Sequence, residues 1–221
     1  MGQSNAVLYI GSRRYSSWSL RGWLAVRCAG ISAEERVIPL SGGHTAAVRA
    51  VSPSGFVPYL EHDGAKVWDS LAILEYCAEI APGLWPGERV ARAHARAISA
   101  EMHSGFRELR MAMPMNCCRR YPGLGITPGS AADIERIVAI WLDARARFGG
   151  AGRYLFGEAL TGADIMFAPV VSRFLTYEPV LPAVAVDYMA AVRMHPLVVA
   201  WYDGAAGEPA SWMIDKYEAM K

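Results

Sequence analysis

Three serines around a tryptophan, Ser16-Ser17-Trp18-Ser19, stand where an apolar, strand-like segment gives way to a helical pattern. The first amides of a helix have no partner within it and carry partial positive charge, so an anion is stabilised there. A hydroxyl at that position can donate a hydrogen bond to such an anion, although one serine can instead act as an ordinary helix N-cap. The run therefore predicts an anion site, with capping as the alternative.

Two further segments could hold parts of a small peptide. Val57-Pro58 begins a strand-like run, and a cis bond there would offer the amide and carbonyl of Val57 to an extended ligand. Asp69-Ser70 stands at a strand-to-helix junction, where a carboxylate, a hydroxyl and unpaired amides could hold the charged end of an amino acid. For Asp69 and Ser70, too, helix capping alone is the alternative.

The elements that would position these residues follow from the spacing of apolar side chains. Short β-branched and aromatic runs indicate strands, Asp63-Gly64 is typical of a two-residue hairpin turn, and apolar residues three or four apart indicate helices. The first part of the chain thus reads strand, helix, strand, then two strands and a helix. Strands are predicted over 6–10, 36–40, 58–62 and 65–68, and helices over 19–29, 42–51 and 70–80.

The remainder of the chain is predicted to be all helical, which makes the whole an α+β protein. Two prolines and two glycines within 81–87 indicate a connecting segment, placed at 82–91 between domains of residues 1–81 and 92–221. Thr161 and Asp164 have the spacing of a capping box and are interpreted as structural. One helical stripe is predicted through Ile98, Met102, Phe106, Leu109 and Met113, and further helices over 134–148, 161–175, 184–192 and 196–205.

Composition narrows the classes of function. The 221 residues carry 22 basic and 21 acidic side chains, so neither nucleic acid nor a membrane surface is an expected partner. The four cysteines lack metal-ligand spacing, and no metal is expected. The start of the chain has no signal-peptide pattern, and its apolar stretches are far shorter than the ~20 residues of a membrane helix. These features predict a cytoplasmic protein.

The motifs and their order resemble those of a glutathione S-transferase over nearly the whole chain. The run Ser16-Ser17-Trp18-Ser19-Leu20-Arg21 is similar to the zeta-class pattern Ser-Ser-Cys-Ser-Trp-Arg of the serine-type enzymes, with Trp18 where zeta enzymes carry cysteine. The resemblance implies a thioredoxin-like N-terminal domain with a four-stranded mixed sheet, followed by an all-helical domain that binds a second substrate. It also implies a homodimer.

The resemblance also implies roles for individual residues. Ser16 would donate a hydrogen bond to the sulfur of glutathione, with Ser17 as the alternative. Arg173 is expected to form an ion pair between helices, with a role as a cation of the second-substrate pocket as the alternative. Val57 would lie before a cis Pro58, and His44 would lie near the glycyl end of glutathione. Substrate-binding roles are implied for His44, Val57, Pro58, Asp69, Ser70, Met102, Phe106, Arg107 and Met113.

The implied chemistry is activation of the glutathione thiol as a thiolate that attacks a small hydrophobic electrophile, with glutathione as co-substrate and no metal. Lowering a thiol pKa from about 8.5 to about 6.5 requires about 2.7 kcal/mol of preference for the anion. A charge-assisted hydrogen bond supplies about 1.5 to 3 kcal/mol and a helix N-terminus about 0.3 to 1 kcal/mol. The alternatives are a zeta-like glutathione-dependent cis–trans isomerase and a non-catalytic protein-interaction or stress factor of the same fold.

Overall fold

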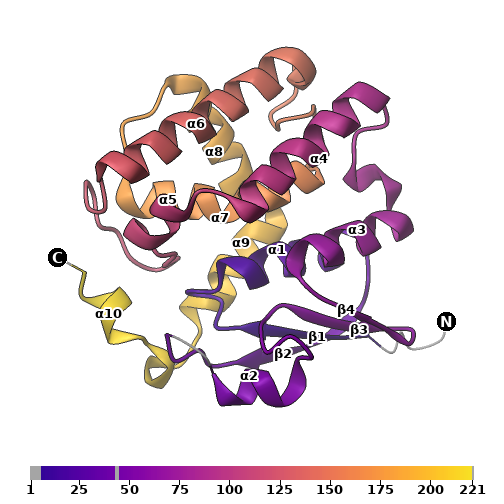
Figure 1. Cartoon of the computed structure of the whole chain (residues 1–221), viewed down its shortest axis with the longest axis vertical. Coiled ribbons are helices and arrows are strands. Elements are labelled where there is room, and N and C mark those ends of the chain that lie inside the picture. The colour runs from indigo at the N-terminus through magenta and orange to yellow at the C-terminus, as the bar shows by residue number, and fades with distance from the viewer. Residues whose placement is uncertain (1–5, 43–44, 221) are drawn as a thin grey trace.

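A computed structural model describes residues 6–42 and 45–220. His44, which was expected at the glycyl end of glutathione, lies outside the described residues. The chain forms a sheet with its own helices, on which a larger group of helices is stacked (Figure 1). The N-terminal thioredoxin-like arrangement and the helical C-terminal part agree with the predicted fold class.

The sheet has four strands in the order β2-β1-β3-β4. β1 pairs in parallel with β2 and antiparallel with β3, which in turn pairs antiparallel with β4, so the sheet is mixed as predicted. Asp63 and Gly64 both have positive φ, 47° and 84°, as a two-residue type I′ hairpin turn requires. The strands are β1 (Ala6–Gly11), β2 (Ala33–Ile38), β3 (Tyr59–His62) and β4 (Ala65–Val67).

Three helices cover the sheet. α1 (Ser17–Cys28) and α3 (Ser70–Ile80) lie on the face toward the helical part, and α2 (Ala46–Val51) lies on the opposite face (Figure 1). α1 packs closely against Pro58, the residue before β3. A Cβ atom added at Gly22 of α1 would lie only 2.7 Å from Cγ of Pro58, so a larger side chain would not fit there. The start of α1 is thereby held next to the segment that carries Val57 and Pro58.

The helical part is organised around α7, which is buried along almost its whole length. The predicted capping box is present at its start, where Oδ2 of Asp164 accepts from the amide of Thr161 at 2.8 Å. No single helix among the described residues is long and apolar enough to cross a membrane, although the bent pair α8 and α9 passes by length and composition. The helices are α4 (Arg89–Ser104), α5 (Arg107–Ala112), α6 (Pro128–Ala144), α7 (Gly162–Tyr177), α8 (Ala183–Arg193) and α9 (Pro196–Ala206).

Some predicted boundaries are wrong. The stripe from Ile98 to Met113 does not lie on one helix, because α4 ends at Ser104 and Phe106 adopts a left-handed φ of 60° before α5 begins. β2 begins at Ala33 rather than at residue 36, since its first half is a polar edge strand that an apolar pattern does not reveal. Residues 82–91 contain a 3₁₀ turn (Pro82–Leu84) and the first turn of α4, and their role as a linker between two domains stays a prediction.

The C-terminal segment, for which no element was predicted, returns to the loop between β1 and α1. A short helix, α10 (Asp215–Glu218), places the Glu218 carboxylate where it accepts from the hydroxyl of Tyr15 at 2.6 Å. Asn116 Nδ2 donates to the same carboxylate at 3.0 Å, and Arg119 Nε donates at 2.6 Å. Glu218 therefore ties the end of the chain to the segment immediately before Ser16.

Candidate active site

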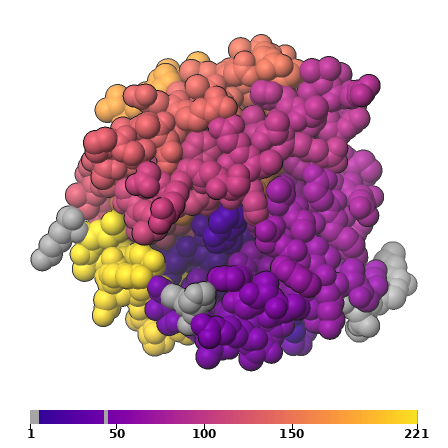
Figure 2. All heavy atoms as spheres, in the orientation of Figure 1, coloured from indigo at the N-terminus to yellow at the C-terminus, as the bar shows by residue number. Residues whose placement is uncertain are grey.

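The three motif segments singled out in the sequence meet at two adjoining cavities. The first, named here the Asp69 cavity, has a volume of about 420 Å³. The second, the Ser16 cavity, has a volume of about 350 Å³ and shares Trp18, Phe56 and Val57 with the first. Figure 2 shows indigo atoms from an early described part of the chain recessed in a hollow between the helical part and the segment around α2. The other lining residues are Ser54, Pro58, Trp68, Asp69, Ser70 and His103 in the first cavity, and Ser16, Leu40, Thr45, Val48 and Gly55 in the second.

Ser16 is the N-cap of α1 and lines the Ser16 cavity. Its Oγ accepts from the amide of Ser19 at 3.3 Å and donates to Oγ of Ser19 at 2.7 Å. Oγ of Ser19 in turn accepts from the amide of Gly11 at 2.9 Å. The hydroxyl of Ser16 therefore lies at a helix N-terminus, at a cavity wall and in a buried hydrogen-bonded chain.

Ser17 points elsewhere. It is the first residue of α1, does not line either cavity, and accepts a long hydrogen bond of 3.5 Å from Nη2 of Arg173. Of the two serines that the sequence left open, Ser16 is thus the one whose side chain borders the cavities.

Asp69 and Ser70 form the far wall of the Asp69 cavity. Asp69 is the N-cap of α3, and its Oδ1 accepts from the amides of Leu71 at 3.0 Å and Ala72 at 3.5 Å. Ser70 is fully buried, and its Oγ has no hydrogen-bond partner among the described residues. Capping of α3 therefore explains the hydrogen bonds of one Asp69 oxygen. It does not explain why the Ser70 hydroxyl is buried without a partner.

The Val57–Pro58 peptide bond is cis, as the resemblance implied. The Trp68–Asp69 bond is also cis, which nothing in the sequence indicated. Val57 borders both cavities and Pro58 borders the Asp69 cavity. The predicted contact residues of the sheet-containing part, apart from His44, are therefore all found at the two cavities.

Trp18 is held between two arginines. The guanidinium of Arg21 lies 4.8 Å from the indole centre and that of Arg110 lies 4.7 Å from it. Arg21 is fully buried, and its Nε donates to the carbonyl of Met166 at 2.8 Å while its two terminal nitrogens have no partner among the described residues. Burial lowers the pKa of Arg21 well below its usual value, and repulsion from Arg110 and Arg173 lowers it further.

Arg173 completes this arginine cluster of Arg21, Arg110 and Arg173. The expected ion pair is absent, because within the described part of the chain Arg173 donates only to the carbonyls of Met113, at 2.7 Å, and Pro169, at 3.3 Å, and to Ser17. Burial lowers the pKa of Arg173 to about 10. None of the three arginines has an ion-pair partner within 4.0 Å among the described residues, although Asp133 attracts Arg110 at longer range. Arg21 and Arg110 flank Trp18, which lines both cavities. Their positive charge favours an anion nearby.

The residues predicted to face the second substrate do not border these cavities. Met102, Phe106 and Met113 are buried in the core, and Arg107 is exposed at the start of α5. The α4 residue that does line the Asp69 cavity is His103, which the sequence analysis missed. The arginine cluster was missed as well, since its three members come from α1, α5 and α7 and share no local pattern.

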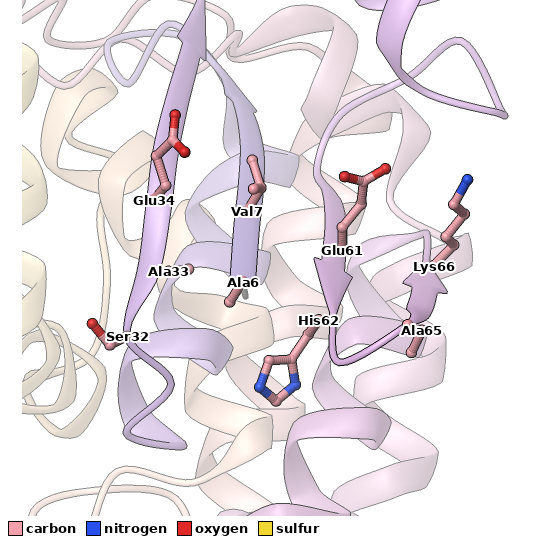
Figure 3. Close-up of a pocket in the computed structure, with 10 residues that line it drawn as sticks. Ala6, Val7, Ser32, Ala33, Glu34, Glu61, His62, Ala65 and Lys66 are labelled. Carbon is pink, nitrogen blue, oxygen red and sulfur yellow. The ribbon is translucent and has the colours of Figure 1, made fainter. Parts of the chain in front are cut away.

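A larger, open cavity of about 950 Å³ lies elsewhere, at the edge where β1 and β2 begin. Glu61 is paired with Lys66, and Glu34 and Glu61 are both paired with Val7, so the side chains of Glu34, Glu61 and Lys66 stand on one face of the sheet (Figure 3). Nδ1 of His62 is 2.8 Å from the hydroxyl of Tyr76. This cavity holds none of the motif residues, and the described residues contain no group of three or more His, Cys, Asp or Glu side chains that could hold a metal ion.

Comparison with known families identifies the chain. Residues 15–80 match the family model of the glutathione S-transferase N-terminal domain, and residues 125–204 match that of the glutathione S-transferase C-terminal domain. These matches cover most of the chain, which therefore belongs to the glutathione S-transferase family of glutathione-dependent enzymes.

Relatives and solved structures agree with this assignment. A maleylacetoacetate isomerase of Rattus norvegicus is 30% identical over 185 residues, covering 78% of this chain and 79% of the relative. A probable maleylacetoacetate isomerase of Caenorhabditis elegans is 29% identical over 175 residues, covering 77% and 79%. A glutathione transferase homologue of a Burkholderia strain, solved with bound glutathione, superposes with a TM-score of 0.69 at 22% identity, covering 92% of this chain and 100% of that one.

A maleylacetoacetate isomerase from Anaeromyxobacter dehalogenans has the same fold, with a TM-score of 0.65 at 20% identity, covering 95% of this chain and 99% of that one. That structure contains dicarboxyethyl glutathione and citrate in its active site.

Proposed function

We propose that this protein binds glutathione across the two cavities and activates its thiol as a thiolate beside Ser16, for attack on a small electrophile. The observation that carries the proposal is the convergence of a helix-capping hydroxyl, the backbone of Val57 and the Asp69–Ser70 pair on two cavities that share a wall. In this arrangement the γ-glutamyl end lies against Asp69 and Ser70, the cysteinyl backbone lies along Val57, and the sulfur lies at Ser16.

The thiolate would be stabilised by groups that are already in place. The Ser16 hydroxyl donates to Ser19 in the structure, and turning it toward the sulfur exchanges that bond for a charge-assisted one worth about 1.5 to 3 kcal/mol. The N-terminus of α1 adds about 0.3 to 1 kcal/mol. The arginine cluster contributes further attraction, because its members have no ion-pair partner within 4.0 Å in the described part of the chain, and Arg21 and Arg110 flank Trp18. No general base is required.

A second candidate is glutathione-dependent cis–trans isomerisation of the zeta kind. It is favoured by the relatives named maleylacetoacetate isomerase. The arginine cluster also suits an electrophile with carboxylate groups, because a carboxylate pairs well with guanidinium groups. Trp18, where the zeta pattern has cysteine, distinguishes this chain from that class.

The same family relationship supports a cytoplasmic homodimer that protects against reactive electrophiles. A non-catalytic interaction factor is the weaker proposal, because such a protein has no need of a hydroxyl, a backbone strand and a carboxylate around one cavity.

The decisive experiment measures binding first and turnover second. We expect retention on a glutathione resin with elution by free glutathione, and a bound thiol that ionises at lower pH than the free thiol. Turnover with an aromatic halide against a maleyl compound then separates conjugation from isomerisation. No binding of glutathione by calorimetry would overturn the proposal.

A further inference from the structure

The Asp69 cavity is closed by a side chain from the other part of the molecule. Eight of its nine lining residues precede residue 81, and the ninth, His103, comes from the last turn of α4. Nε2 of His103 lies 3.0 Å from Oδ2 of Asp69. This contact links α4 to the residue that begins α3.

Both oxygens of the Asp69 carboxylate are thereby fixed. Oδ1 accepts from the first amides of α3, and Oδ2 is held by the imidazole. An aspartate that only capped α3 would be free to turn its second oxygen into solvent, because the Asp69 side chain is 57% exposed. The histidine therefore sets the direction in which the second oxygen presents its charge.

The imidazole of His103 contacts Asp69 through one ring nitrogen. Nε2 lies 3.0 Å from Oδ2 of Asp69, whereas Nδ1 is buried and has no hydrogen-bond partner among the described residues. The ring is held edge-on to Trp18, with centroids 5.2 Å apart.

A buried donor stands beside this carboxylate. Ser70 lines the cavity, and its buried Oγ has no hydrogen-bond partner among the described residues. A fixed negative charge next to a free hydroxyl and a helix N-terminus matches an ammonium group and a carboxylate carried on one carbon atom. That is the pattern of the free α-amino-acid end of a γ-glutamyl peptide.

We propose that His103 is a positioning residue for glutathione recognition: it aims Oδ2 of Asp69 at the α-ammonium group of the γ-glutamyl end. This inference rests on the proposed function, since it names how the same site selects its ligand. It assigns to α4 a part in binding glutathione itself, rather than in binding only the second substrate.

Calorimetry with three ligands tests the assignment. Glutathione carries both head-group charges, glutaryl-Cys-Gly lacks the ammonium, and 4-aminobutyryl-Cys-Gly lacks the α-carboxylate. We expect His103→Leu to weaken glutathione and 4-aminobutyryl-Cys-Gly by about tenfold, the usual size of one lost charge-assisted hydrogen bond, and to leave glutaryl-Cys-Gly unchanged. His103→Gln, which keeps a donor near the same place, should retain most of the affinity for glutathione.

The matched control is His94→Leu. His94 lies on the same helix and makes the same kind of contact, with Nε2 3.3 Å from Oδ2 of Asp143, but it does not border the cavity. It should leave all three affinities unchanged. Equal weakening of all three ligands by His103→Leu, or no weakening at all, overturns the role of His103. If wild-type protein binds none of the three ligands, it is the proposed function that fails instead.

Discussion

Arg173 in α7 donates through Nη2 to Oγ of Ser17 in α1, at 3.5 Å, across 156 positions of sequence. The contact occupies the hydroxyl of Ser17 as an acceptor and holds it away from the two cavities. It leaves Ser16, one residue earlier, as the hydroxyl that borders the proposed sulfur position. The two serines therefore have distinct predicted roles that single substitutions can separate.

Ser16→Ala is expected to raise the pKa of the bound glutathione thiol by about one to two units, because one charge-assisted hydrogen bond to the thiolate is lost. Glutathione affinity should change little, since the backbone and head-group contacts remain. The measurement is thiolate absorbance of the complex as a function of pH. Ser17→Ala is the control, and an equal or larger shift in that variant would contradict the assignment of Ser16.

Arg21→Met tests the positive charge of the arginine cluster. The buried guanidinium makes one hydrogen bond within the described part of the chain, so replacing it with an apolar side chain of similar length should leave the free energy of unfolding within about 1 kcal/mol of wild type or raise it. The bound thiol should become less acidic. Denaturant unfolding and the same absorbance titration measure the two effects.

A control for Arg21→Met comes from the same helix. Arg27 is exposed and also lies over an indole, that of Trp23, at 5.6 Å. Arg27→Met should change neither stability nor thiol acidity. A large loss of stability in Arg21→Met would show that the buried arginine is needed for the fold.

Asp164→Ala should be one of the most destabilising single substitutions in the helical part. Its carboxylate accepts from the amides of Leu155, at 3.0 Å, and Thr161, at 2.8 Å, and from the Thr161 hydroxyl. Alanine leaves these buried donors unpaired, which should cost about 3 kcal/mol or more of unfolding free energy. Denaturant melts compare this variant with Asp187→Ala, an exposed position in α8 where the change should be below about 0.5 kcal/mol.

The protein's own thiols are expected to be slow nucleophiles. Burial raises the pKa of Cys28 to about 11 and those of Cys77 and Cys117 to about 12. Because only the thiolate reacts, alkylation by iodoacetamide should be slow at pH 8 and rise only as the pH approaches those values. Mass spectrometry of native and denatured protein measures this, and rapid native alkylation of Cys28, Cys77 or Cys117 at pH 8 would contradict it.

Local signals were sufficient for most of the fold. The predicted helix over 70–80 matches α3 residue for residue, because Asp69 is a strong N-cap and the apolar spacing that follows it is clean. The hairpin at Asp63-Gly64 is likewise encoded by two neighbouring residues. The break before Phe106 has a local signal, because Gly105 is the C-cap of α4, but the apolar side chain of Phe106 continues the stripe and masks it.

The candidate site was predictable only where its residues carry a recognisable neighbour pattern. Ser16, Val57 and Asp69 each stand in a short motif next to a strand or helix end. His103 has no such context, since its partner is 34 positions away and its own helix reads as an ordinary alanine-rich one. Its relation to Asp69 depends on how α4 stacks on the first part of the chain, and no local spacing encodes that geometry.

The contact between Tyr15 and Glu218, next to Ser16, joins residues that are synthesised at very different times. Tyr15 and the carboxylate that receives its hydroxyl are separated by 203 positions, so during synthesis the loop emerges from the ribosome long before its partner exists. The strands and helices of a nascent chain can therefore begin to form before the hydrogen bond between Tyr15 and Glu218 exists. The contact next to Ser16 therefore forms only after Glu218 has been synthesised, and a change that disturbs α10 would act on a segment that lies far from it in the sequence.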